Sequence, residues 1–306
     1  MTALAAPAAP AARGTRRPRG LTWAVLRLHR TALWLSLAAL AAAALVSVWM
    51  YVIGDDARRG ISACATPATG RLPSCAEVAA IGADETYTAG IGLLTGTLAY
   101  LVFPVTAWAG GALIGRELEN GTARLAWTQS VTPARWLAAK LAVPAALLTA
   151  GTAAALALLE WARGDGDPNL TGDWYLPDVF VSGGPTAVAH PLAGLVLGAL
   201  AGLLTGRALP AAGLSLAVWT VLHNVLEHYR GDLWPALTRT AGGATFELPR
   251  SAFAVGTVHD QDRMTSATYH PRSHLLPLQL VETGILLALT AAAAAACHLL
   301  LRRRAS

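Results

Sequence analysis

Charged residues are scarce in this chain, and their scarcity excludes a soluble globular fold. Only 13% of the 306 residues are Asp, Glu, Lys or Arg, whereas 54% are hydrophobic. A chain with so few polar side chains cannot cover the surface of a water-soluble protein of this size. We therefore expect an integral membrane protein.

Lysine is almost absent, because Lys140 is the single lysine of the chain. The phosphate-binding loop Gly-x4-Gly-Lys-Ser/Thr needs a lysine at the start of a helix. Lys140 stands in the sequence Ala-Ala-Lys-Leu, which does not match that loop. The chain therefore cannot hydrolyse ATP by this route.

Cysteine is also rare, with three residues and no Cys-x-x-Cys pair, so we expect no metal site. Cys64 and Cys75 fall in a loop predicted to lie outside the cell, where an oxidising environment permits a disulfide between them. The sequence leaves open whether they are bonded. Cys297 lies in the last apolar stretch and is expected to be a small buried side chain.

Six apolar stretches are long enough to cross a hydrocarbon core of about 30 Å, which takes roughly 20 helical residues. They cover about 33–53, 89–114, 141–159, 187–206, 209–226 and 279–301. Pro104 lies within the second stretch and predicts a tilt or kink there. The sequence therefore predicts an all-α integral membrane protein, with one six-helix membrane domain over residues 21–306.

The basic residues predict the orientation of these helices. If both termini are cytoplasmic, the inner segments hold 14 of the 23 basic residues and only two of the 18 acids, Glu117 and Glu119. Cytoplasmic loops of membrane proteins carry such an excess of Arg and Lys. The net charge of +5 is thus explained by topology, and we expect no binding of nucleic acid.

The segment before the first span divides into two parts. Residues 1–20 are rich in Ala, Pro and Arg, and we expect a disordered cytoplasmic tail attracted to anionic membrane lipid. Residues 21–30 alternate apolar and basic side chains, which predicts a short helix lying in the membrane interface. Alternatively, this segment extends the first span into water.

The loop between the second and third spans has an ordered pattern of helix ends. Gly121 predicts the end of one helix, because glycine readily takes the left-handed conformation after a C-terminus. Thr122 is placed to cap a short helix, and Thr132-Pro133 to start the next, with Thr at the N-cap and Pro at the first position. We therefore expect a short transverse helix between two spans, where another protein makes contact. The alternative is an ordinary charged inner loop.

Two further patterns lie within the predicted spans. A glycine recurs at every fourth position of the fourth span, at Gly194, Gly198, Gly202 and Gly206, and such a stripe lets helices approach closely in lipid. We expect it to pack against the fifth span or a second copy of the chain, with intramolecular packing favoured. Polar residues Gln279 and Glu282 begin the sixth span, where an acid either anchors the outer end or needs a partner.

Several segments resemble the permeases of ABC-2 type ATP-binding-cassette transporters, in particular the shorter actinobacterial type. In the inner loop these are Arg116–Thr122, Leu125–Val131, Arg135-Trp136-Leu137 and Lys140. Elsewhere they are Gly206–Ala211, Tyr269-His270-Pro271, Pro277-Leu278-Gln279 and Glu282. The resemblance covers the chain from about residue 20 to its end.

The resemblance implies a plasma-membrane permease subunit without catalytic activity, driven by a separate ABC ATPase that binds ATP and Mg. It further implies a second permease copy, a coupling helix in the inner loop and export of a hydrophobic or amphipathic substrate, with Glu117 and Glu119 as ionic partners of the ATPase. The implied coupling residues are Arg116, Glu117, Glu119, Gly121, Thr122, Arg124, Trp127, Gln129 and Arg135.

Two other functions remain open at this point. A membrane sensor or immunity protein would bind an extracellular compound without transporting it. An intramembrane enzyme would need catalytic groups that converge at one depth, and the scattered histidines do not indicate such a group.

Overall fold

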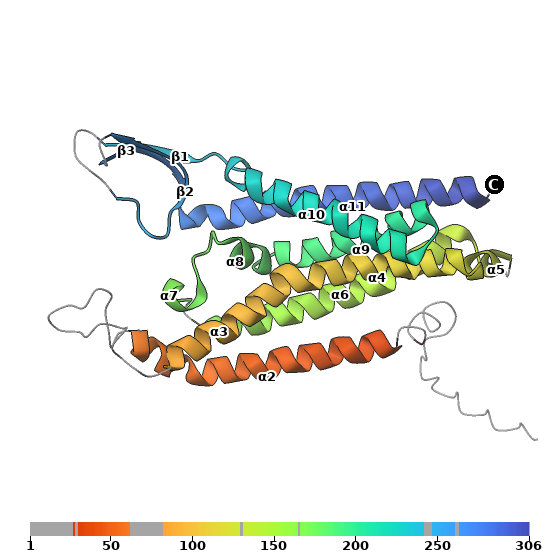
Figure 1. Cartoon of the computed structure of the whole chain (residues 1–306), viewed down its shortest axis with the longest axis horizontal. Coiled ribbons are helices and arrows are strands. Elements are labelled where there is room, and N and C mark those ends of the chain that lie inside the picture. The colour runs from red at the N-terminus through yellow and green to blue at the C-terminus, as the bar shows by residue number, and fades with distance from the viewer. Residues whose placement is uncertain are drawn as a thin grey trace, which may run out of the picture.

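The computed structural model describes residues 27, 30–61, 82–128, 131–164, 166–241, 247–260 and 263–305. They form an elongated bundle whose long helices run roughly along one axis, with a small β-sheet at one end (Figure 1). The helical elements are α2 (Arg30–Ile61), α3 (Ala83–Gly96), the π-helix η1 (Thr97–Leu101), α4 (Val102–Glu119), α5 (Thr122–Thr128), α6 (Pro133–Arg163), α7 (Pro168–Thr171), α8 (Pro177–Ser182), α9 (Thr186–Thr205), α10 (Ala208–Tyr229), the 3-10 helices η2 (Arg230–Asp232) and η3 (Arg272–His274), and α11 (Leu275–Ala305).

Six helical segments of the described residues are long and apolar enough to cross a membrane, as the sequence predicts. They are Arg30–Arg59, Ala83–Glu119, Pro133–Arg163, Thr186–Thr205, Ala208–Asp232 and Arg272–Arg303. Most extend beyond the predicted stretches, because charged residues at the stretch ends continue the helix instead of ending it. The all-α membrane fold is therefore confirmed.

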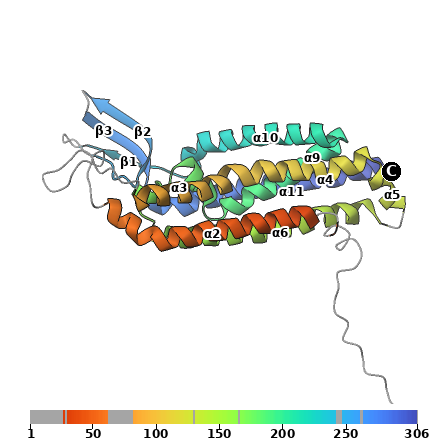
Figure 2. The same cartoon turned by 60° about the horizontal axis from the view of Figure 1, so that its bottom comes forward.

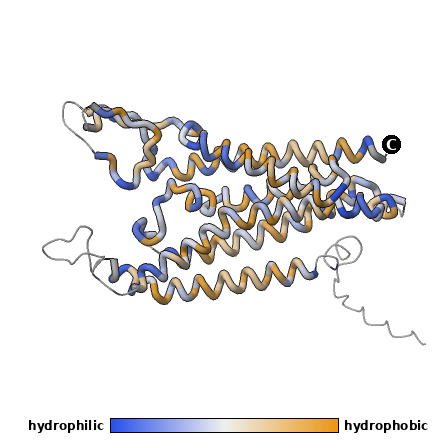
Figure 3. The backbone as a smooth tube through the Cα atoms, viewed as in Figure 1, coloured by the Kyte–Doolittle hydropathy of each residue, from blue (hydrophilic) through white to orange (hydrophobic). Residues whose placement is uncertain are grey.

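The start of α2, the short helix α5 and the C-terminus lie at the same end of the bundle, and the sheet lies at the other (Figures 1 and 2). The first group includes the ends that the basic residues predict to be cytoplasmic. We call it the cytoplasmic end and the opposite one the outer end. Hydrophilic segments gather toward both ends of the helices, whereas their middle portions are predominantly hydrophobic (Figure 3).

Large apolar side chains are exposed along the spans, as expected for contact with lipid. Trp34 and Leu45 on α2 and Leu209 on α10 are more than two thirds exposed. In water such a surface would be unstable, and in a bilayer it faces hydrocarbon. The six apolar spans and this exposed apolar surface together indicate a multi-pass membrane protein.

The second span is irregular near its middle. α3 continues through the five-residue π-helix η1 into α4, and Pro104 stands in the first turn of α4. Proline cannot donate a backbone hydrogen bond, and its ring crowds the carbonyl four residues earlier, which is Tyr100 within η1. The wider π-turn accommodates this break without ending the span.

Helix α9 lies within the bundle, and its glycines face α4. A Cβ at Gly198 would lie 2.2 Å from the carbonyl oxygen of Ala107, and one at Gly110 would lie 2.1 Å from that of Leu195. Gly194 and Gly202 are similarly close to α4. The two backbones thus approach more closely than any side chain would permit.

Two features of the glycine stripe differ from what the sequence predicts. Its partner is α4 and not α10, because the small residues of α4 leave room for the α9 backbone. Gly206 does not belong to the packing surface, since no atom lies within 4 Å of a Cβ placed there. It ends α9 with a positive φ of 65°, the left-handed conformation that glycine adopts at low cost.

The outer loop contains an antiparallel sheet that was not predicted from the sequence. The strands are β1 (Leu237–Thr240), β2 (Phe253–Asp260) and β3 (Arg263–His270), in the order β1-β3-β2. The indole Nε1 of Trp174, just before α8, donates a 2.7 Å hydrogen bond to the carbonyl of Ser251. This contact ties the strand-bearing loop to the turns between α6 and α9.

Several predictions fall outside the described residues. These are the tail over residues 1–20, most of the interfacial segment 21–30, and the cysteines Cys64 and Cys75. Cys297 lies within the described part and is fully buried, as expected.

The close approach of α4 and α9 makes a small side chain costly. Gly198→Ala should lower the free energy of unfolding by about 1–3 kcal/mol, because the new Cβ overlaps a backbone oxygen that cannot rotate away. Thermal unfolding of the purified protein in detergent measures the loss. Gly213→Ala on α10 is the matched control, since no atom lies within 4 Å of its Cβ position. Equal midpoints for the two variants would contradict the tight seam.

Candidate functional site

The junction between α4 and α6 forms the helix ends that the sequence predicts. α4 ends at Glu119, and Gly121 follows with a φ of 71°. The amide of Asn120 donates to the carbonyl of Arg116 at 3.0 Å, and that of Gly121 donates to Leu118 at 3.3 Å. These bonds satisfy carbonyls that the helix end would otherwise leave free.

The short helix α5 follows directly, and α6 begins after it. Thr122 is the first residue of α5, and its hydroxyl donates to the carbonyl of Glu117 at 3.3 Å instead of capping an amide. Thr132 is the N-cap of α6, where its hydroxyl oxygen accepts from the amide of Arg135 at 3.4 Å, and Pro133 occupies the first position. The predicted order of helix, turn, short helix, turn and helix is therefore present.

Glu117 faces inward and contacts α6. One of its carboxylate oxygens accepts a 3.0 Å hydrogen bond from the indole Nε1 of Trp136, and the other forms an ion pair with the ammonium group of Lys140. The side chains of Lys140 and Glu117 are only 7% and 18% exposed. The carboxylate thus links α4 to α6 within the chain. This ion pair was not predicted from the sequence.

Glu119 is exposed but also bonds to its own chain. Its carboxylate accepts a 3.2 Å hydrogen bond from the amide of Ala208, the first residue of α10. An acid at a helix N-terminus satisfies a free amide and complements the positive end of the helix dipole. The two acids that were expected to reach toward a partner protein therefore bind α6 and α10.

Three arginines lie exposed around the junction. Arg116 on α4, Arg124 on α5 and Arg135 on α6 form no ion pair with any other described residue. Glu117 is paired with Lys140, so the three arginines face only one exposed carboxylate, Glu119, and this surface carries a net positive charge. Its chemistry suits an acidic surface on another molecule.

One side of α5 is packed into the bundle while the other is exposed. Ala123 is fully buried, and the ring of Trp127 lies edge-on to that of Trp136, with centroids 5.8 Å apart. Leu125 is 59% exposed beside Arg124. Gln129 falls outside the described residues. The buried side belongs to a cluster that joins five helices, comprising Leu113, Ile114, Ala123, Trp136, Leu137, Ala199, Leu203, Cys297 and Leu301.

The polar residues at the start of the sixth span find partners on other helices. Glu282 is fully buried, with its carboxylate 3.1 Å from Nε2 of His190 and 3.2 Å from Nε of Arg230. The guanidinium of Arg230 also lies 4.1 Å from the ring centroid of Phe180. A buried carboxylate needs such partners, because an unpaired charge is costly away from water.

Gln279 has a similar role one turn earlier. Its amide nitrogen donates to the carbonyls of Phe180 and Gly183, at 3.1 and 3.2 Å, and so holds the turn between α8 and α9 against α11. The sequence marked both polar residues of α11 but not His190 or Arg230 as their neighbours. The only sign of such a partner in the sequence was His190, a lone histidine on an apolar helix.

Comparison with known families decides what kind of protein carries this junction. A family model described as ABC-2 membrane transporter related matches residues 35–230. That range covers nearly two thirds of the chain and includes the whole junction from α4 to α6. The chain belongs to the ABC-2 membrane transporter related family. No curated protein and no solved structure matches it.

Membership fixes the general role of this ABC-2 protein. It is a membrane permease subunit of a transporter, and the family as a whole works with ABC ATPases. The match ends at Arg230, so it does not extend over the outer sheet and α11.

The Glu117–Lys140 pair should stabilise the junction of the permease. Lys140→Met leaves the carboxylate without its cation and should cost about 1.5–3 kcal/mol of unfolding free energy. The double change Glu117→Gln with Lys140→Met should recover most of this loss, because the amide that replaces the carboxylate is neutral and can still accept from Trp136. Denaturant or thermal unfolding of the unmodified protein, the two single variants and the double variant gives the coupling energy. Additive effects would show that the two groups do not interact.

Proposed function

We propose that this permease subunit exports a hydrophobic or amphipathic substrate and is driven by a separate ABC ATPase that docks on α5. The observation that carries the proposal is the division of α5 into two sides. Its exposed side presents Arg124 and Leu125, while its opposite side is packed among α4, α6, α9 and α11. A protein that moves α5 therefore moves the bundle with it.

The exposed surface suits a partner with complementary chemistry. Arg116, Arg124 and Arg135 offer positive charge around an apolar contact at Leu125. Interfaces commonly combine an apolar centre with a charged rim, and charge complementarity selects the partner. We infer that the ATPase surface is acidic, and that Glu117 and Glu119 hold the junction in shape and do not contact the ATPase directly.

Movement at α5 has a defined route into the membrane domain. The ion pair of Glu117 joins α4 to α6, the carboxylate of Glu119 joins α4 to α10, and the glycine surface joins α4 to α9. ATP and Mg would bind the partner ATPase, whose closure would displace α5. The apolar exposed surfaces of the spans fit contact with lipid and with a second permease copy.

Charge reversal on α5 tests the docking site. Arg124→Glu should reduce, by about tenfold or more, recovery of the ATPase that co-purifies with the tagged permease, because it places an acid against an acidic surface. Arg302→Glu on α11 is the control, since it makes the same change at the same end of the bundle but on a helix other than α4, α5 and α6. The measurements are ATPase recovery on affinity purification and ATP turnover of the isolated complex.

Two results would overturn the proposal. Equal recovery and turnover for Arg124→Glu and the unmodified protein would remove α5 as the docking site. Purification of the permease without any ATPase, from cells that respond to an external compound through it, would instead support a membrane sensor.

A further inference from the structure

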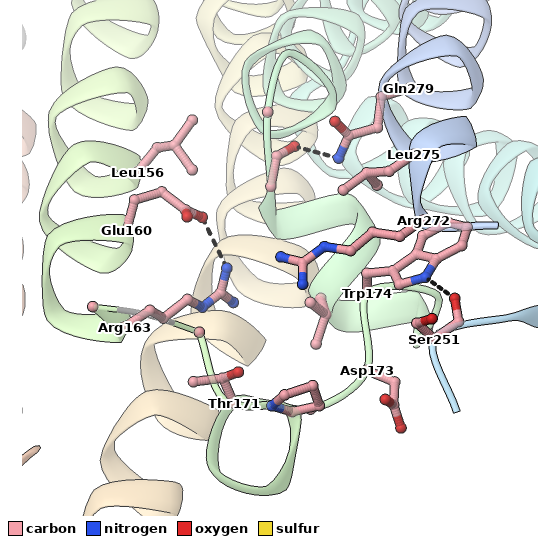
Figure 4. A pocket seen from close by; sticks show the side chains of 17 residues that line it. Leu156, Glu160, Arg163, Thr171, Asp173, Trp174, Ser251, Arg272, Leu275 and Gln279 are labelled. Atoms are coloured by element: carbon pink, nitrogen blue, oxygen red, sulfur yellow. Dashed lines mark hydrogen bonds and ion pairs between the residues drawn. The ribbon is translucent and has the colours of Figure 1, made fainter. Parts of the chain in front are cut away.

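A cavity of about 430 Å³ opens at the outer end of the bundle, remote from α5. Its walls come from the end of α6, the turns around α7 and α8, and the start of α11 (Figure 4). The volume falls within the range of small-molecule binding sites. Nothing in the proposed coupling to an ATPase makes use of it.

The cavity holds two arginines from different elements. Arg163, the last residue of α6, is 8% exposed, and its Nη atoms donate to Glu160 at 2.9 Å and to Thr95 at 2.8 Å. Its buried Nε has no hydrogen-bond partner among the described residues. Arg272 forms no ion pair with any described residue. Its guanidinium reaches into the same cavity toward Glu160 and Arg163 (Figure 4).

The acids of the cavity are already neutralised within the described part of the chain. Glu160 pairs with Arg163, and Asp173 pairs with Arg250 at 3.2 Å. Arg272 is thus a surplus cation facing a buried guanidinium that retains a free donor. Arg163, Arg272 and Glu160 together carry one net positive charge. This suits an anion, to which Arg272 can offer parallel N–H donors.

Glycines form part of the cavity wall. Five glycines line it, and four of these have positive φ, between 54° and 81°. At Gly184 a Cβ would lie 2.3 Å from the amide oxygen of Gln279. Larger residues would therefore strain the turns.

Another part of the wall is apolar and includes the outer end of a membrane span. Leu156 lies two turns before the end of α6, and Val179 and Leu275 also contribute apolar side chains. A ligand whose charged group meets the arginines could lay an alkyl chain along α6 toward the bilayer. An inorganic anion would leave this apolar wall unused.

We propose that this cavity binds the phosphate head group of an anionic amphiphile at the outer surface of the membrane. Arg163 and Arg272 hold the phosphate, and the alkyl chain lies against Leu156 and α6. The ligand is either an anionic lipid of the bilayer or a free alkyl phosphate, which share this chemistry. Binding needs no ATPase, so its test is independent of the proposed coupling site.

The full-length chain in nanodiscs of neutral phosphatidylcholine allows a direct test. Radiolabelled hexadecyl phosphate should bind saturably after subtraction of uptake by empty nanodiscs. Arg272→Gln should weaken this binding about tenfold or more, because a charge-assisted contact is lost. Arg272→Lys should restore part of the affinity by returning the charge. Arg239→Gln, which removes a cation from exposed strand β1 at the same end, should leave binding unchanged.

Competitors distinguish the source of the ligand. Displacement of the probe by phosphatidylglycerol placed in the nanodisc supports the proposal with a bilayer lipid as ligand. Displacement by soluble alkyl phosphate alone supports it with a free amphiphile. The proposal is overturned if the probe does not saturate, if Arg272→Gln binds like the unmodified protein, or if inorganic phosphate displaces the probe at equal concentration.

Discussion

The close packing of α4 against α9 is the constraint on which the rest of the bundle depends. Gly110 on one helix and Gly198 on the other bring the backbones within a distance that a methyl group would prevent. In lipid there is little hydrophobic driving force between helices, so close van der Waals contact must supply much of the association. Helices α10 and α11 pack beside the pair formed by α4 and α9. The short helix α5 follows the end of α4 and is positioned by it.

Charge pairing supplements this packing at both ends of the membrane domain. Glu117 takes its partners from α6 at the cytoplasmic end, while Glu282 takes its partners from α9 and from η2 at the outer end. An acid near lipid must be paired or solvated, so each one specifies which helices are neighbours. The few charges of this apolar chain thus help to specify which helices pack against each other.

Local features of the fold were predictable from the sequence, whereas long-range partners were not. Gly121 and Thr132-Pro133 act through the conformations of their own backbones, so their effect does not depend on distant residues. The ion-pair partner of Glu117 is 23 residues away, and the two partners of Glu282 are 92 and 52 residues away. Nothing in a single sequence ranks one buried polar residue above another as the partner. The strands of the outer loop did carry a sign, since Val255, Thr257 and Val258 are β-formers, but a run with few buried side chains lacks the alternation that identifies a strand.

The irregular helices on either side of α5 bear on how movement at the junction would enter the membrane. The outer part of the second span, α3, packs with α2 and with the outer end of α6, and the hydroxyl of Tyr87 bonds to the carbonyl of Ala162 at 2.8 Å. The inner part, α4, packs instead with α9 and α10, and η1 separates the two parts. α6 has a corresponding break, since Pro144 removes one backbone hydrogen bond within the helix. Both helices that flank α5 are therefore weakest between the clusters that hold their two ends. A displacement of α5 would bend them at these breaks, because bending there disrupts fewer hydrogen bonds than separating either cluster.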